Sequence, residues 1–279
     1  MGVLEATMER PTMYGWFHLM WFGIVLLAIV VLCLVVRVPR RQTNNRVVLV
    51  CGVLMLLFEI YKQIVFTHSS DGTWEYQWYA FPFTFCSLPM YAMLLAAILR
   101  KGKVHDALLA FLATYGLLGG LCVYLFPSTV FIETIGINIQ TMVHHGCQIV
   151  VGVFLLTRGN VSNKFKKTLL PAALVFAALV LLATALNEIM FYCNPAIGHG
   201  AGQQTFNMME MSRHFDCTLP VFSNIQQWMR ANGNWNVWYP FFLLLYYAAF
   251  TGGAALMLLM DRLVWAILKP AKKHKKRRA

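Results

Sequence analysis

The chain has few charged residues and especially few acidic ones. Of its 279 residues only 12% are charged, with 11 acidic against 23 basic side chains, while 59% are hydrophobic. This composition leaves too little polar surface to cover a soluble globule, so it excludes that class. The longest connection between apolar runs covers only residues 193–236, which leaves no room for a separate soluble domain.

Several functional signatures are also missing. The seven cysteines contain no CxxC pair, which argues against a zinc site or a thioredoxin-like motif. The last apolar run has no lysine before Lys269, so it lacks the Schiff-base residue that a seven-helix retinal protein needs. The residues before the first apolar run include Glu5 and Glu9, whereas a cleavable signal peptide would carry basic residues there. We therefore expect no cofactor, no metal and no cleaved leader.

The apolar runs themselves are long enough to cross a bilayer. A hydrocarbon core of roughly 30 Å needs about 20 apolar residues per helix. We predict an all-α, polytopic membrane helix bundle, with one integral membrane domain over residues 1–279. The seven predicted transmembrane helices cover residues 16–38, 46–67, 78–99, 104–126, 137–157, 168–192 and 237–268.

Basic residues lie in alternate connections, which predicts the topology. The first, third and fifth connections and the tail 269–279 are rich in Lys and Arg, whereas the second and fourth have none. The positive-inside rule then places the N-terminus outside and the C-terminus in the cytoplasm of a multi-pass cell-membrane protein. With a net charge of +12 distributed in this way, we expect the basic tail to contact anionic lipid headgroups and not nucleic acid.

The connection 193–236 lies outside the cell in this topology. It is too apolar for a free linker, since it carries Phe222 and Trp228, and we expect a lid or a re-entrant element packed over the outer mouth of the bundle. Cys193 and Cys217 both belong to this connection, and an oxidising environment makes a disulfide between them a candidate.

Polar side chains within the spans are the clearest functional signal. Cys86 lies in the segment Phe81–Pro89, and His144 and His145 lie in the fifth span. Each falls about eight residues below the outer boundary, or roughly 12 Å, and Glu59 of the second span falls at a similar depth. Intramembrane ionisable groups usually face a bundle interior or a wet cavity.

These residue types fit nucleophilic catalysis. A thiol needs a base to form the reactive thiolate, and a third group to orient that base. We expect Cys86 as nucleophile and His145 or His144 as base. The supporting candidates are Gln140, Gln148 and Glu59 as orienting groups, Lys62 as the ion-pair partner of Glu59 three residues away, and Asn187, Asn207 or Gln140 as oxyanion donors. Pro89, close after Cys86, is expected to kink the third span.

Other interpretations of the same residues stay open. Polar side chains between helices can simply fix packing. Broken helices and polar groups inside a membrane also suit a transporter or a binding protein for a small solute or lipid, in which Glu59, Lys62 and His145 would line the path. A metal site from Cys86, both histidines and Glu59 has no ligand spacing to support it.

Four stretches of the sequence resemble bacterial YwaF-type integral membrane proteins. They are Pro-Phe-Thr-Phe-Cys86-Ser-Leu-Pro-Met-Tyr, His145-Gly146, Phe206-Asn207-Met-Met and Cys217-Thr-Leu-Pro220. That family is related to an animal multispan acyltransferase that remodels ether phospholipids through a cysteine on one span and a histidine nearly sixty residues later. Here His144 follows Cys86 by 58 positions and His145 by 59. The resemblance covers most of the chain and implies membrane phospholipid substrates and a Cys/His lipid acyl-transfer site, with either transfer or hydrolysis as the outcome.

Overall fold

The computed structural model describes residues 4–36, 40–68, 72–127, 130–159, 161–162 and 164–268. Within these ranges the regular elements are helices, joined by turns and isolated β-bridges. The all-α prediction is therefore confirmed for the described residues. The basic tail 269–279 lies outside them.

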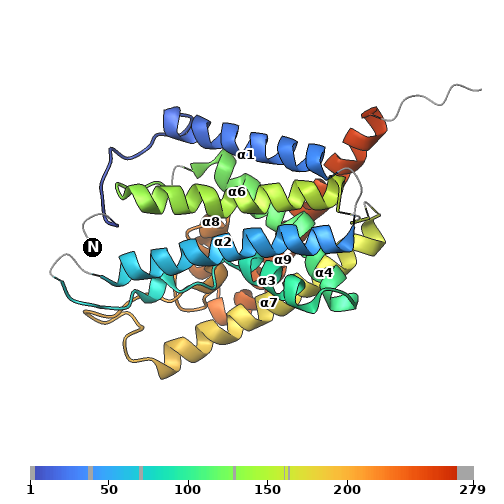
Figure 1. Ribbon diagram of the computed structural model, residues 1–279. Coiled ribbons are helices and arrows are strands. Elements are labelled where there is room, and N and C mark those ends of the chain that lie inside the picture. The colour runs from blue at the N-terminus through green and yellow to red at the C-terminus, as the bar shows by residue number, and fades with distance from the viewer. Residues whose placement is uncertain are drawn as a thin grey trace, which may run out of the picture.

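Six helical segments are long and apolar enough to cross a membrane in the described part of the chain, and they run roughly side by side (Figure 1). They are α1 (Trp16–Val35), α2 (Arg41–Thr67), the continuous segment Lys103–Leu125, α6 (Ile135–Thr157), α7 (Phe165–Cys193) and α9 (Trp235–Leu268). The segment 103–125 and α6 form the centre, with 72% of each apolar window buried, whereas α1 is peripheral with 11%. Central helices are the ones that can hold polar side chains away from lipid.

The third predicted span has a different structure. A short 3-10 turn, η1 (Trp78–Ala80), and irregular chain precede α3 (Leu88–Leu99), which has only 12 residues. At 1.5 Å per residue this helix extends about 18 Å, too short to cross the hydrocarbon alone. The kink expected at Pro89 is not found. Pro89 occupies the first turn of α3, where its missing N–H removes no intrahelical bond.

The helix of the fourth predicted span is continuous but contains a π-helical turn. It consists of α4 (Lys103–Phe111), a π-helical turn η2 (Leu112–Gly116) and α5 (Leu117–Leu125). Glycines on α5 face the next helix: a Cβ on Gly120 would lie 2.9 Å from the His145 carbonyl oxygen. The small residues therefore let α5 approach α6 closely, as small residues do between membrane helices.

The connection between α7 and α9 folds onto the bundle, and its role as an outer lid stays a prediction. It contains the turn η4 (Met208–Glu210) and the helix α8 (Phe222–Ala231), and its residues Phe206, Met208 and Met211 are buried in the main core. The disulfide predicted in this region is absent. Cys193 is exposed at the end of α7, whereas Cys217 is buried against Met229 and Phe242, and both are free thiols.

Candidate functional site

One cavity gathers most of the polar residues singled out in the sequence. It has a volume of about 220 Å³ and lies between α2, the segment before α3, and α6. Its polar lining consists of Glu59, Lys62, Thr84, Cys86, Ser87, Gln140, Thr141, His144 and His145. The predicted convergence of thiol, imidazoles and carboxylate in one place is thus found in the structure.

Cys86 is held just before the N-terminus of α3. Ser87 is the residue that precedes the helix, and its hydroxyl lies 3.2 Å from the hydroxyl of Thr84. The Gln148 side-chain amide of α6 donates a 2.8 Å hydrogen bond to the Cys86 carbonyl oxygen. Gln148 therefore fixes the position of the cysteine backbone, which is a more specific role than orienting the base.

The two histidines lie on consecutive positions of α6 but have different hydrogen-bond partners. His145 Nδ1 lies 2.7 Å from the Thr141 carbonyl oxygen, an acceptor, so this nitrogen carries the proton. His144 Nδ1 lies 3.2 Å from the Gln140 amide nitrogen, a donor, so this ring accepts there and carries its proton on Nε2. In their neutral forms His145 presents a lone pair at Nε2 and His144 presents an N–H.

Both Nε2 atoms are buried, and neither has a hydrogen-bond partner among the described residues. His144 is 2% exposed and His145 6%, so bulk water does not satisfy either ring. A buried polar group without a partner costs roughly 1–3 kcal/mol. Both residues line the cavity, and a ligand there that has both a donor and an acceptor would satisfy the pair.

Glu59 and Lys62 form the ion pair expected from their spacing on α2, with Lys62 Nζ 2.7 Å from Glu59 Oε1. The same carboxylate oxygen accepts a 2.8 Å bond from Gln63, which also donates to the Ala80 carbonyl oxygen. Oε2 of Glu59 is buried without a partner. Because Lys62 is held in this ion pair and lines the cavity together with Cys86, the site contains a fixed cation.

Asn187 and Asn207 lie outside this cavity. Asn187 uses its amide to bond both the N–H and the carbonyl oxygen of Met208, at 2.8 and 3.1 Å. Asn207 accepts from the Ser212 N–H and donates to the Asp216 carbonyl oxygen. Both amides hold the 194–234 connection together, so their predicted role as oxyanion donors is wrong in this structure.

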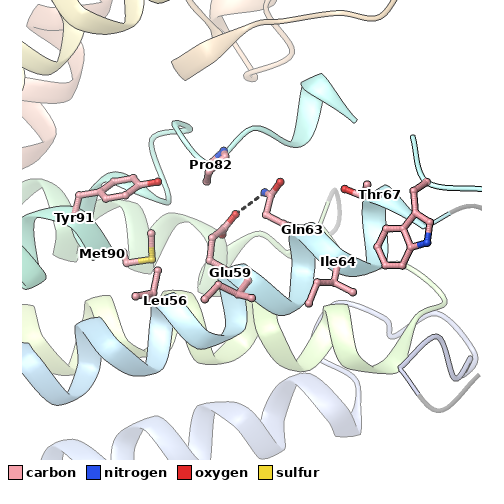
Figure 2. A pocket seen from close by; sticks show the side chains of 10 residues that line it. Leu56, Glu59, Gln63, Ile64, Thr67, Pro82, Met90 and Tyr91 are labelled. Carbon is pink, nitrogen blue, oxygen red and sulfur yellow. Dashed lines mark hydrogen bonds between the residues drawn. The ribbon is translucent and has the colours of Figure 1, made fainter. Parts of the chain in front are cut away.

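An apolar groove adjoins the cavity along α2 (Figure 2). It has a volume of about 360 Å³ and is lined by residues such as Leu56, Ile64 and Met90, with Tyr91 among them. Glu59 lines both the groove and the polar cavity. The two spaces therefore meet at this carboxylate.

Sequence reasoning missed Thr84, Ser87 and Thr141. The first two flank Cys86 closely, but isolated hydroxyl residues carry no periodic signal, and Thr141 acts through its backbone carbonyl, which any residue provides. Among the described residues no group of three or more His, Cys, Asp and Glu side chains is placed to hold a metal ion.

A comparison with known protein families shows which family the chain belongs to. Residues 13–260 match the model of the TMEM164 family, and because this match covers most of the chain, the chain belongs to that family. No curated protein and no solved structure matches it. The family and the apolar helices together identify an integral membrane protein, whereas the YwaF-type name stays a prediction.

Proposed function

We propose that this member of the TMEM164 family is a membrane-embedded phospholipid acyltransferase or lipid hydrolase that uses Cys86 as nucleophile. The observation that carries this proposal is the single cavity lined by Cys86 and by two imidazoles whose Nε2 atoms have no partner. A structural packing network would leave fewer buried polar atoms without partners.

The hydrogen bonds of the two histidines support different roles for them. His145, with its lone pair at Nε2, is the base that takes the proton of the Cys86 thiol. The sulfur then attacks an ester carbonyl carbon, and a C–S bond forms as the C–O bond of the ester breaks. The proton passes from His145 to the leaving alcohol oxygen, which leaves a thioester on Cys86.

The second half of the reaction reverses these steps with another alcohol. His145 removes the proton of a lysolipid hydroxyl, whose oxygen attacks the thioester and releases the thiol. Water in place of the lysolipid gives hydrolysis. His144 donates its Nε2–H to the carbonyl oxygen as negative charge develops there, the role of an oxyanion donor.

The surroundings of the cavity favour a lipid ester over a small soluble ester. The apolar groove that shares Glu59 with the cavity offers a place for an acyl chain whose carbonyl lies beside Cys86 (Figure 2). The predicted depth of the site, roughly 12 Å below the outer boundary, is compatible with an ester just below the headgroups. We further propose a cell-membrane location with the N-terminus outside.

Acyl transfer onto the protein tests the proposal directly. Purified full-length protein is incubated with a phospholipid that carries a labelled acyl chain, and we expect label on the wild type but not on Cys86→Ala. Cys122→Ala is the matched control, because Cys122 is a free thiol on α5 outside the cavity. Absence of label on the wild type, together with equal lipid turnover in both variants, would remove the enzyme assignment.

The ion pair in the cavity favours one alternative, a transporter or binding protein for a small solute or lipid. Glu59 and Lys62 offer both charges to a ligand. In that case Cys86→Ser would keep ligand-induced thermal stabilisation or flux at the wild-type level, while Lys62→Met would abolish it. A catalytic thiol predicts loss of turnover in Cys86→Ser.

A further inference from the structure

A second polar cavity lies at the other end of α2, away from the thiol. It has a volume of about 310 Å³, which is within the usual range of small-molecule sites, about 300–1,000 Å³. It lies where α2, α4 and α7 begin and α6 ends. Its polar lining consists of Arg41, Asn44, His105, Asp106, Ser162, Lys167 and Thr168. None of these residues takes part in the proposed acyl transfer.

Three helix N-termini meet at this cavity without side-chain caps. The residues that precede α2, α4 and α7 make no side-chain hydrogen bond to the first turns. Arg41 opens α2 and Lys167 lies in the first turn of α7, where positive side chains oppose the positive end of the helix dipole. An anion between them would offset both the dipoles and the side-chain charges.

Two hydrogen-bond partners hold His105 in the lining of this cavity. This side chain is 1% exposed, with Nδ1 2.7 Å from Asp106 Oδ1 and Nε2 2.8 Å from Asn45 Oδ1. Asn45 uses its amide nitrogen to donate to the Arg100 carbonyl oxygen, which fixes the oxygen toward the ring. Both ring nitrogens therefore face acceptor oxygens of neighbouring side chains.

Charge at the cavity is therefore unbalanced. Asp106 is the one acidic side chain among the lining residues, and it already contacts His105 at 2.7 Å and Arg41 at 3.9 Å. Lys167 has no ion pair among the salt bridges of the described residues. With Arg41 and Lys167 against one carboxylate, the site favours an anion.

Asn44 indicates what else the ligand carries. Asn44 lines the cavity, is 3% exposed and donates to the Gly159 carbonyl oxygen, while its Oδ1 is buried without a partner among the described residues. An anionic oxygen does not bond to this acceptor, but a hydroxyl does. We propose that this cavity binds a phosphate ester with a neighbouring hydroxyl, such as the phosphoglycerol headgroup of an anionic phospholipid. Arg41 and Lys167 contact the phosphate, and Asn44 accepts from the hydroxyl.

The test uses the full-length protein in zwitterionic detergent micelles and follows its thermal unfolding midpoint as ligand is added. Phosphatidylglycerol is compared with phosphatidylmethanol, which has the same charge but lacks the hydroxyl, and with phosphatidylcholine. We expect saturable stabilisation in the order phosphatidylglycerol, phosphatidylmethanol, phosphatidylcholine. Glycerol 3-phosphate and inorganic phosphate form the soluble arm. Stabilisation by soluble glycerol 3-phosphate would assign the site to the free ester, and stabilisation by the lipid alone to a headgroup.

Charge-matched double variants separate this site from general surface attraction. Arg41→Gln with Lys167→Gln should lower the apparent affinity for phosphatidylglycerol about tenfold or more, because two charge-assisted contacts are lost. Arg46→Gln with Lys166→Gln removes the same charge nearby, and neither residue lines the cavity, so this control should keep wild-type affinity. Equal loss in both double variants would overturn the proposal.

Asn44→Ala tests the hydroxyl contact through a ratio. This variant also loses the bond to Gly159 and unfolds at a lower temperature, so the informative quantity is the preference for phosphatidylglycerol over phosphatidylmethanol. We expect that preference to disappear while binding of both anionic lipids remains. An unchanged preference would remove Asn44 from the site.

Discussion

The cavity beside Cys86 and the 194–234 connection use the same kinds of buried polar side chain but complete their hydrogen bonds differently. Asn187 near the end of α7 and Gln226 within the connection each bond with both ends of the amide to backbone groups of the connection. Next to the cavity, Gln148 bonds with its nitrogen to the Cys86 carbonyl oxygen only, and its own oxygen has no partner among the described residues. Burial alone does not distinguish the two, since all three amides are at most 1% exposed.

The difference shows which polar residues serve the fold and which are available for a ligand. A buried amide that closes a backbone loop contributes to stability and leaves nothing to bind. The side chains around Cys86 retain unpartnered atoms on both imidazoles and on Glu59. Four predictions test this contrast, from the largest expected effect to the smallest.

The largest effect is expected at His145. His145→Gln removes the Nε2 lone pair of the proposed base in the cavity that Cys86 also lines, so acyl transfer should fall by about 10²–10⁴-fold, and alkylation of Cys86 by a lipid-soluble maleimide should slow with it. His144→Gln retains an N–H donor, so it should slow acyl transfer without slowing alkylation. If His144→Gln and not His145→Gln slows alkylation, the two assigned roles are reversed.

Asn187→Leu should reduce stability without affecting the thiol. The change leaves the N–H and carbonyl oxygen of Met208 buried without partners, at roughly 1–3 kcal/mol each, so the free energy of unfolding should fall by about 2–6 kcal/mol. Chemical denaturation in micelles measures this loss. Below the unfolding transition, the alkylation rate of Cys86 should equal that of the wild type; a slower rate would place Asn187 in the site.

Gly120→Ala should disturb the packing of α5 against α6, the helix that carries His145. Its Cβ would lie 2.9 Å from the His145 carbonyl oxygen and 3.0 Å from the Gln148 Cβ, so α5 and α6 must separate. Overpacking of this kind costs typically 1–3 kcal/mol. Gly23→Ala on α1 is the control, because a Cβ there meets nothing within 4 Å. Thermal unfolding midpoints of both variants decide whether close approach of α5 is required.

The smallest effect is a pH dependence in the 194–234 connection. Burial raises the pKa of Glu210, against the opposing hydrogen bond from the Thr218 N–H. A carboxyl with a raised folded-state pKa contributes stability below its usual pKa of 4.5, and this contribution is lost as the pH rises through the folded value. Glu210→Gln should therefore flatten the fall of the unfolding midpoint above about pH 4.5. A steeper fall in the variant would contradict this sign.

Sequence reasoning predicted the membrane class, the positions of most long helices and the convergence of Cys86 with the histidines. These follow from apolar length and from depth along a helix, both of which are local properties. It failed at the third predicted span, because an apolar composition does not reveal that residues 81–87 are irregular before α3 begins. Hydropathy measures transfer to lipid, and not whether the backbone is helical.

The polar residues could not be sorted by sequence either. Asn187 lies at a suitable depth on α7, but its amide bonds Met208, which is 21 positions away in a connection without periodic pattern. The proton positions of His144 and His145 also depend on their hydrogen-bond partners one turn earlier on α6. Only the three-dimensional arrangement reveals which nitrogen is free.

The bond between Gln148 and the Cys86 carbonyl oxygen has a mechanical consequence. The Cys86 sulfur belongs to an irregular segment, yet that segment is hydrogen-bonded to the same helix that carries the imidazoles. A tilt of α6 in a thicker or thinner bilayer is therefore transmitted through this bond to Cys86, so that the thiol follows the helix that carries the imidazoles.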